Sequence, residues 1–220
     1  MYGVKIVCSL LLLSLTICAS SCTQTRVRTH NVDLLSTGLV GWQQVDGQEG
    51  TWHFKDGVLC TEGENGGWLA THRQYENFVL ALEFRVPPGG NSGVFIRAPL
   101  QGDPAYTGME IQILDDRAEQ WSGLQAFQYM GSIYGVQAPS ERVSKKAGEW
   151  QEMVIVARGS EVQVILNGRK IIDTVLTRYL HKLDEHPGLL RPRGHIGLQN
   201  HGSRVEFRHI RLRELPDALS

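Results

Sequence analysis

The sequence predicts an all-β domain, built as an antiparallel sandwich or jelly roll. Short apolar or alternating segments recur along the chain, and turn residues separate them at short spacing. Two of these turns carry the Asp-Gly or Asn-Gly pair that suits a tight hairpin. No segment shows a sustained helical stripe, and no linker divides the domain. These three observations favour one domain made of strands.

Two hairpins are the clearest local prediction. Asp56-Gly57 and Asn167-Gly168 are pairs that tolerate positive φ angles, and each lies between two apolar segments. The paired strands are expected at 51–54 with 58–61, and at 162–166 with 169–172. Both hairpins support an antiparallel arrangement.

A longer strand is predicted at 78–86, where every second residue is apolar and shares one face. Pro87-Pro88-Gly89-Gly90 ends it. Further strands are expected at 92–98, 108–114, 150–158, 193–200 and 204–213. Only 116–130 and 176–190 read as irregular or briefly helical segments.

The N-terminus reads as an export signal. Lys5 precedes an apolar stretch that is too short to span a bilayer but has the length of a signal-peptide core. Ala19, Ser20 and Ser21 then lead into Cys22, which resembles a bacterial lipobox. We expect acylation of Cys22 to anchor the chain, so that its only membrane contact is the lipid. An ordinary cleaved signal with an incidental Cys22 is the alternative.

The chain therefore divides into three parts. Residues 1–21 form a lipoprotein signal peptide, polar residues 22–31 form a tether, and 32–216 form the jelly-roll domain. Such a protein is expected in the bacterial cell envelope, exported and held on the periplasmic side or the cell surface. The 22 Lys and Arg residues nearly balance 23 Asp and Glu residues, so no basic excess favours nucleic acid as a partner.

The segment 110–115 is the densest cluster of polar side chains. In a strand, Ile111 and Ile113 point one way, while Glu110 and Gln112 point the other way, about 7 Å apart. A bulge at the end of the strand would bring Asp115 to the Glu110 face. The alternative is a solvated sheet face, the usual place of charged strand residues.

A second candidate strand starts at Asn91. Its alternation directs Asn91, Phe95 and Arg97 to the face opposite the core. An arginine beside an aromatic ring suits an anionic or sugar-like ligand. An ion pair between Arg97 and Glu110 on neighbouring strands is the alternative, and both can hold at once.

Two further segments contribute candidate side chains. Gln199 and His201 follow one another at a strand end, where a histidine can act as an acid, a base or a metal ligand. Tyr134 lies between glycines and can donate to a ligand or pack. Each signal is weak in isolation.

Taken in order, the motifs resemble a known family. They are Asp33-Leu34-Leu35, Gly41-Trp42, Asp56-Gly57, 90–97, 110–115, Ile133-Tyr134-Gly135, Gly148-Glu149-Trp150, Leu166-Asn167-Gly168, 197–202 and Phe207-Arg208-His209-Ile210. The set resembles the family formerly called domain of unknown function 1080, described as 3-keto-disaccharide hydrolase, 3-keto-glucoside 1,2-lyase and 3-keto-2-hydroxy-glucal hydratase. The resemblance covers about residues 32–215 and implies a concanavalin A-like jelly-roll sandwich of two antiparallel sheets.

The resemblance also implies an unusual route of glycoside cleavage. A partner sugar C3-dehydrogenase first oxidises the sugar, and the 3-keto sugar is the substrate. The ketone acidifies the proton on C2, so a base removes it and the enolate expels the group on C1. Water then adds to the unsaturated sugar. No certain cofactor follows from this route.

The cluster of polar residues supplies candidate roles for that chemistry. We assign Glu110 or His201 as the base and Asp115 as an acid. The positioning donors are Arg97, Gln112, Tyr134 and Gln199, and Asn91 and Phe95 complete the substrate-binding set. A divalent cation held by Glu110, Asp115 and His201 is a further possibility.

Two other functions remain open. Segment 110–115 has the spacing of the Glu-x-Asp-x-x-Glu run of jelly-roll glycosidases, but Gln112 replaces the central acid and Asp115 the final one. These differences weigh against direct hydrolysis with retention. A non-catalytic carbohydrate-binding lipoprotein is the third hypothesis, because the same fold hosts lectins.

Overall fold

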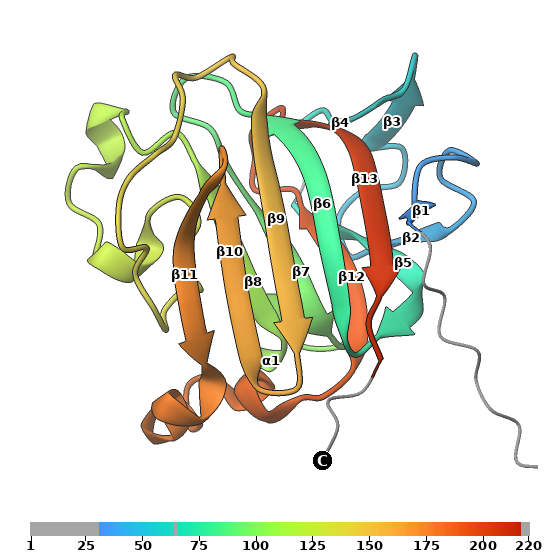
Figure 1. Cartoon of the computed structure of the whole chain (residues 1–220). Helices are drawn as coiled ribbons and strands as arrows, with labels where there is room; N and C mark the ends of the chain where they lie inside the picture. The colour runs from blue at the N-terminus through green and yellow to red at the C-terminus, as the bar shows by residue number, and fades with distance from the viewer. Residues whose placement is uncertain (1–30, 64–65, 217–220) are drawn as a thin grey trace, which may run out of the picture.

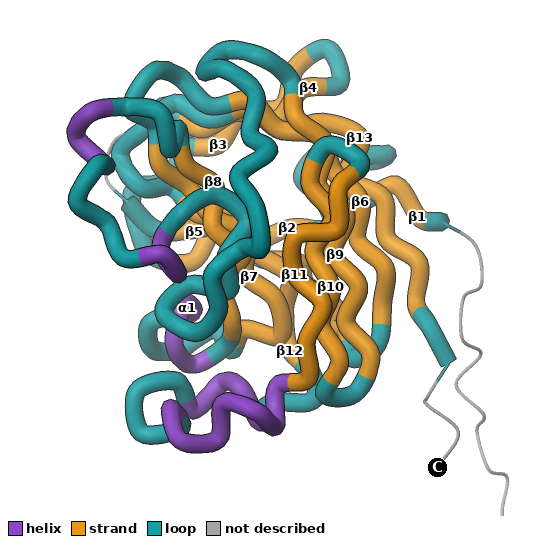
Figure 2. The backbone as a smooth tube through the Cα atoms, turned by 60° about the vertical axis from the view of Figure 1, so that its left-hand side comes forward, coloured by secondary structure: helices purple, strands orange, loops and turns teal. Residues whose placement is uncertain are grey.

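The computed structural model describes residues 31–63 and 66–216 as two antiparallel sheets packed face to face (Figure 1). Figure 2 shows the two layers from the side, with loops and short helices gathered around the smaller sheet. The predicted two-sheet sandwich is thereby confirmed. The predicted signal peptide at 1–21, the lipid site Cys22 and all but the last residue of the tether lie outside the described residues.

The described elements are strands of two to nine residues and a few short helices. The strands are β1 (Val32–Asp33), β2 (Trp42–Val45), β3 (Trp52–Lys55), β4 (Val58–Thr61), β5 (Trp68–Tyr75), β6 (Phe78–Arg85), β7 (Asn91–Ala98), β8 (Met109–Leu114), β9 (Gln151–Arg158), β10 (Glu161–Leu166), β11 (Arg169–Val175), β12 (Gly194–Gln199) and β13 (Glu206–Glu214). The helical turns are α1 (Pro104–Thr107), η1 (Glu119–Trp121), η2 (Ala126–Gln128), η3 (Leu176–Lys182) and η4 (Pro187–Leu190).

The larger sheet has the order β11-β10-β9-β6-β13-β4-β3, with β1 paired to β13. The smaller sheet has the order β2-β5-β12-β7-β8. Neighbours such as β7 and β12 lie about a hundred residues apart in sequence, so the smaller sheet is assembled from long-range pairings. Strand β8 ends this sheet and therefore has a free side for other segments.

The core lies between the two sheets and follows the predicted alternation. On β6, Phe78, Leu80, Leu82 and Phe84 are buried, whereas the residues that alternate with them are only half-buried. On β8, Ile111 and Ile113 face the same core from the other sheet. Burying apolar side chains from both sheets stabilises the sandwich, at about 1.5–3 kcal/mol for each large side chain.

Both predicted hairpins are confirmed, because β3–β4 and β10–β11 are antiparallel pairs. Asp56 and Gly57 have φ angles of 52° and 78°. Asn167 and Gly168 have φ angles of 51° and 80°. Positive φ at both central positions matches the right-handed twist of the flanking strands.

The predictions missed strands β1, β2 and β5 and the short helix α1. Trp68, Leu69, Ala70 and Thr71 of β5 are all buried, so the strand has no alternating pattern at its start. A strand buried on both faces cannot be distinguished from other apolar segments by its periodicity. Helix α1 has a single turn, which Asp103 caps by accepting a hydrogen bond from the Ala105 amide at 3.0 Å.

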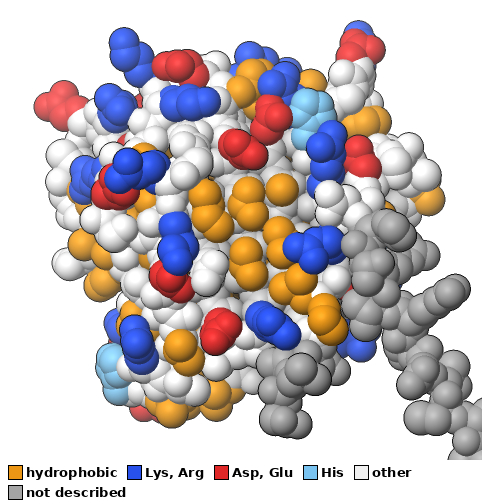
Figure 3. Space-filling view, in the orientation of Figure 1, with side chains coloured by type: hydrophobic (Ala, Val, Ile, Leu, Met, Phe, Trp, Pro, Cys, Tyr) orange, Lys and Arg blue, Asp and Glu red, His pale blue; other side chains and the backbone are white. Residues whose placement is uncertain are grey.

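The outer face of the larger sheet carries apolar side chains at its centre and charged ones around them (Figure 3). Trp150 lies at its margin, between the guanidinium groups of Arg85 and Arg208, at 4.8 and 4.0 Å from the ring centre. Among residues 31–63 and 66–216, no helix is both long and apolar enough to cross a bilayer.

Arg97 belongs to the fold, and its predicted place on the ligand-binding face is wrong. The β7–β12 register shifts just before it, and its φ angle is 51°, so the alternation that begins at Asn91 ends there. The guanidinium is buried and donates to the Glu76 carbonyl oxygen at 2.9 and 3.0 Å and to the Gly159 carbonyl oxygen at 2.7 Å. It therefore joins two turns of the sandwich and forms no ion pair with Glu110.

Arg97→Ala is expected to lower the free energy of unfolding by about 2–4 kcal/mol, because the buried side chain and its hydrogen bonds to the Glu76 and Gly159 carbonyl oxygens are lost together. Urea denaturation of the purified domain measures the change. Arg97→Lys, which keeps the charge without the planar fork, should lose part of this stability. A loss below about 0.5 kcal/mol for Arg97→Ala would contradict the assigned role.

Candidate active site

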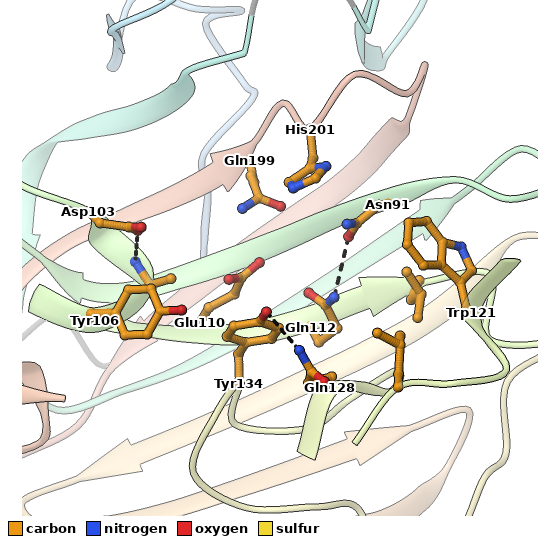
Figure 4. A pocket seen from close by; sticks show the side chains of 13 residues that line it. Asn91, Asp103, Tyr106, Glu110, Gln112, Trp121, Gln128, Tyr134, Gln199 and His201 are labelled. Carbon is orange, nitrogen blue, oxygen red and sulfur yellow. Dashed lines mark hydrogen bonds between the residues drawn. The ribbon is translucent and has the colours of Figure 1, made fainter. Parts of the chain in front are cut away.

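A cavity of about 420 Å³ opens on the outer face of the smaller sheet (Figure 4). Its walls come from β7, β8, β12, helix α1 and the loop between β8 and β9. The lining residues are Asn91, Asp103, Ala105, Tyr106, Glu110, Gln112, Leu114, Trp121, Leu124, Gln128, Tyr134, Gln199 and His201. Carboxyl, amide, phenol and imidazole groups therefore share one space.

Strand β8 forms the floor of the cavity. Because side chains alternate along a strand, Glu110, Gln112 and Leu114 face the cavity while Ile111 and Ile113 face the core. The sequence predicted this division for the first four residues, and the structure confirms it. Glu110 is only 3% exposed although its side chain is ionisable.

The free side of β8 is covered by segment 131–134. The backbone N–H of Gln112 donates to the Ser132 carbonyl oxygen at 3.0 Å, and the backbone N–H of Tyr134 donates to the Glu110 carbonyl oxygen at 2.9 Å. These bonds pair backbone N–H and C=O groups of β8 that would otherwise be unpaired at the edge of the sheet. They also place the Tyr134 side chain beside Glu110 in the cavity wall (Figure 4).

Gly93 on β7 provides the space that the Glu110 carboxyl occupies. A Cβ atom at Gly93 would lie 2.0 Å from Glu110 Oε1, too close for any side chain. The residue has an ordinary negative-φ backbone, so glycine is needed here for space and not for conformation. The carboxyl therefore lies flat against the neighbouring strand.

Burial strongly perturbs the acidity of this carboxyl. Desolvation, with a smaller effect from the negative charge of Asp103, raises the pKa of Glu110 from 4.5 to about 8. A group with this pKa exists in both protonation states near neutral pH, as a general acid–base catalyst requires. The same environment, burial first and then Tyr134 and Asp103, raises the pKa of Tyr106, so its phenol stays protonated.

The side-chain amide of Gln112 can orient the Glu110 carboxyl. With Nε2 toward Asn91, it donates to Asn91 Oδ1 at 3.3 Å (Figure 4). A rotation of the amide by 180° turns the donor toward Glu110 Oε1 and the Ser92 carbonyl oxygen, each at 3.1 Å. In that orientation Gln112 stabilises the ionised form of Glu110.

Two phenols form the lower wall of the cavity. The Tyr134 hydroxyl oxygen accepts a hydrogen bond from Gln128 Nε2 at 3.0 Å, which leaves its own proton to be donated. Tyr106 packs edge-on against Tyr134, with ring centres 6.4 Å apart, and against the His186 ring at 5.0 Å. These contacts hold both hydroxyl groups at the polar side of the cavity (Figure 4).

Six of the predicted site residues line this one cavity. They are Asn91, Glu110, Gln112, Tyr134, Gln199 and His201. Phe95, Arg97 and Asp115 are outside it, and their predicted roles at the site are corrected. Phe95 lies on the outer face of the smaller sheet, as predicted, but it is only 2% exposed and packs edge-on against Trp68, with ring centres 5.4 Å apart, in a small cluster with Ala105 of α1.

Asp115 does not join Glu110, because β8 pairs with β7 without a bulge and the alternation ends at Leu114. The Asp115 carboxylate instead accepts a hydrogen bond from the Gly89 amide at 2.8 Å and so holds the turn before β7. Within residues 31–63 and 66–216, no three His, Cys, Asp or Glu side chains group as metal ligands. Glu110, Asp115 and His201 therefore do not form the divalent-cation site considered from the sequence.

Four polar or aromatic residues of the cavity were not predicted: Asp103, Tyr106, Trp121 and Gln128. All four lie in single helical turns or directly before one, within segments that carry no strand pattern. The Asp103-Pro104 pair is a helix-start signal and was the one available clue to this wall.

A family model for the 3-keto-alpha-glucoside-1,2-lyase-like domain matches residues 33–213. The chain belongs to this family. A curated relative of this chain, the 3-keto-disaccharide hydrolase of Bacteroides thetaiotaomicron, is 26% identical over 203 residues. That match covers 74% of this chain and 70% of the relative. The resemblance found in the sequence motifs is confirmed.

Solved structures share the fold of this chain. A crystal structure of a candidate glycosyl hydrolase from Parabacteroides distasonis has a TM-score of 0.76 and 31% identity, and covers 84% of this chain and 100% of that chain. A second one from the same species has a TM-score of 0.73 and 25% identity, with coverages of 86% and 95%. The carbohydrate binding module CBM66 from Bacillus subtilis shares the fold alone, with a TM-score of 0.53 and 14% identity over 79% of this chain and 96% of that module. The concanavalin A-like jelly roll is confirmed.

Glu110→Gln is expected to change how stability depends on pH. The folded wild type binds a proton at Glu110 up to about pH 8, whereas the unfolded chain releases it near pH 4.5. Its free energy of unfolding should therefore fall as pH rises between these values and then level off. The variant has no titrating group there and should escape this loss, on the order of 2–4 kcal/mol.

Urea denaturation at pH 5 and pH 9 measures this difference. Glu161→Gln, which replaces an exposed glutamate at the start of β10, is the matched control and should behave as the wild type. An equal pH dependence in the wild type and Glu110→Gln would contradict the raised pKa of Glu110.

Proposed function

We propose that this chain cleaves 3-keto-glycosides by elimination followed by hydration. Glu110 removes the proton from C2, which the neighbouring C3 ketone makes acidic. The enolate that forms expels the oxygen on C1, which takes up a proton and leaves as an alcohol. Water then adds at C1 of the unsaturated sugar, so the products are a 3-keto sugar and the free alcohol. The names of the family and of its relatives support an enzyme that acts on glycosides.

One observation carries the proposal. Glu110 is the buried carboxyl of the cavity, and its environment raises its pKa to about 8. A carboxylate of ordinary acidity is a weak base toward carbon, whereas one with this pKa is a better match for a proton next to a ketone. His201, the other base considered from the sequence, is exposed at the rim of the cavity.

The remaining polar groups suit the enolate and the sugar hydroxyls. The Tyr134 phenol, whose oxygen already accepts a bond from Gln128, can donate its proton toward a developing oxyanion. Tyr106 offers a second protonated phenol that can hold a hydroxyl group of the reacting sugar. Gln199 and His201 lie across the cavity from these phenols (Figure 4) and can hold sugar hydroxyls.

The proposed substrate requires a partner reaction, since ordinary sugars carry a hydroxyl at C3. We propose that a sugar C3-dehydrogenase supplies the ketone. From the sequence alone, we also propose that the protein is exported to the bacterial cell envelope, with lipid on Cys22 as its membrane contact.

Direct hydrolysis of unoxidised glycosides is the second candidate function. Glu110 and Asp103 line the same cavity, and the charge of Asp103 adds to the raised pKa of Glu110. A protonated carboxyl beside an ionised one is the pair that direct glycosidases use. The two functions differ in whether the substrate must carry a ketone.

Purified protein should convert 3-keto-trehalose and leave trehalose intact. In D₂O, deuterium should appear at C2 of the recovered 3-keto sugar. The rate constant kcat/KM should rise with pH and level off above about pH 8, since the base is active when ionised. Glu110→Gln should lower kcat by about 100- to 10,000-fold.

Two glycine variants test whether the position of the Glu110 carboxyl matters. Gly93→Ala should displace the carboxyl without removing it and lower kcat by about 100-fold. Gly41→Ala, with nothing within 4 Å of the added Cβ, should keep full activity. Cleavage of trehalose itself would favour direct hydrolysis, binding without product would favour a carbohydrate-binding protein, and full activity of Glu110→Gln would remove Glu110 from the mechanism.

A further inference from the structure

The two ends of the cavity differ in chemistry. Asp103, Tyr106 and Glu110 lie toward one end, where acidic and phenolic groups meet (Figure 4). Trp121 lies at the opposite end in the same view. Leu114 and Leu124 add apolar surface to the lining. The polar end fits the reacting sugar, but the Trp121 end has no role in the proposed proton transfers.

Strand β8 sets the distance between these ends. Glu110, Gln112 and Leu114 are successive cavity-facing residues, so the carboxyl and the leucine are separated by about 13 Å of strand. This length accommodates two linked six-membered rings side by side. With the keto sugar over Glu110, a group attached to C1 can extend along β8 to Trp121.

The Trp121 ring is fixed in place by its own loop. The indole Nε1 donates to the Gly89 carbonyl oxygen at 3.2 Å, and the backbone carbonyl oxygen of Trp121 accepts a hydrogen bond from the Tyr129 hydroxyl at 3.2 Å. The Arg142 guanidinium stacks on the Tyr129 ring, 3.4 Å from its centre, and secures that contact. The indole is half-buried and lines the cavity, so it presents apolar surface to a ligand.

The charges of the cavity restrict what can bind there. Its lining contains no Lys or Arg, and it holds the two acidic residues Asp103 and Glu110. Asn91 and Gln128 provide neutral amides. An anionic leaving group such as a phosphate would be repelled and would find no cation.

We infer that the Trp121 end is the leaving-group subsite, and that it takes a neutral ring with a flat apolar face. Both an aryl group and the carbon face of a second sugar have this chemistry, since each can stack on an indole ring. The inference rests on the proposed function, because Glu110 fixes where C2 and therefore C1 must lie. It adds that the enzyme selects its substrates by the group that departs.

The test compares Trp121→Ala with the wild type on three 3-keto-glucosides of one anomeric form: methyl, phenyl and a disaccharide. For the phenyl and disaccharide substrates, kcat/KM should fall by about 3- to 10-fold. For the methyl substrate it should change less than about twofold, because a methyl group cannot reach the indole. Taking the variant-to-wild-type ratio for each substrate removes differences in leaving-group reactivity.

Three controls distinguish the loss of ligand stacking on Trp121 from a general disturbance of the structure. Hydration of 3-keto-2-hydroxy-glucal, which has already lost its leaving group, should be unchanged in Trp121→Ala. Trp121→Phe, which keeps a ring but loses the Nε1 donor, should retain most of the preference. Trp150→Ala removes a tryptophan from the outer face of the other sheet, and its variant-to-wild-type ratio of kcat/KM should be about one for every substrate.

An equal loss for methyl, phenyl and disaccharide substrates, or an equal loss in hydration, would overturn the subsite while leaving the proposed function intact. Phenyl and disaccharide substrates that respond differently would show which of the two rings the subsite prefers, and either response alone supports stacking. Absence of turnover of every 3-keto-glucoside by the wild type would instead contradict the proposed function, and the subsite with it.

Discussion

The burial of one carboxyl group is the constraint on which the rest of the site depends. Glu110 occupies an outward position of β8, yet it is nearly inaccessible to water because Gly93 on the next strand leaves room for it and the loops of the cavity cover it. Desolvation of this kind disfavours the charged form, and the nearby Asp103 charge acts in the same direction. The fold therefore accepts a destabilised carboxylate where its chemistry needs one. Such a cost is expected at a functional site.

Packing and hydrogen bonds hold the elements around Glu110 in place, so the carboxyl stays buried in spite of this cost. The core between the sheets fixes β8 from below, and segment 131–134 fixes its outer side through backbone hydrogen bonds. The loop that carries Trp121 is tied to the turn before β7, where Asp115 also binds the Gly89 amide. A buried charge keeps a perturbed pKa only when its neighbours cannot rearrange to solvate it. Positioning and acidity thus have a common origin.

Periodicity and turn chemistry were sufficient to predict the strands that bear the floor of the site. The alternation around Glu110 and Gln112 was correct because one face of β8 packs against the core. Arg97 was misplaced because a bulge and a positive φ interrupt the same kind of pattern on β7, and Asp115 because the bulge expected beside it does not exist. Asp103, Tyr106, Trp121 and Gln128 were missed because they lie in or directly before short helical turns, whose position depends on tertiary contacts that a sequence pattern does not encode.

A direct titration of the Glu110 carboxyl tests the central claim most sharply. Protein labelled with ¹³C at glutamate side-chain carboxyls, followed by NMR between pH 4 and pH 10, would report each group separately, and the signal that is missing from Glu110→Gln identifies the one of interest. The structure predicts a midpoint near pH 8 for that signal. A midpoint near 4.5, the value of an ordinary solvated glutamate, would contradict the account of how this cavity obtains its base.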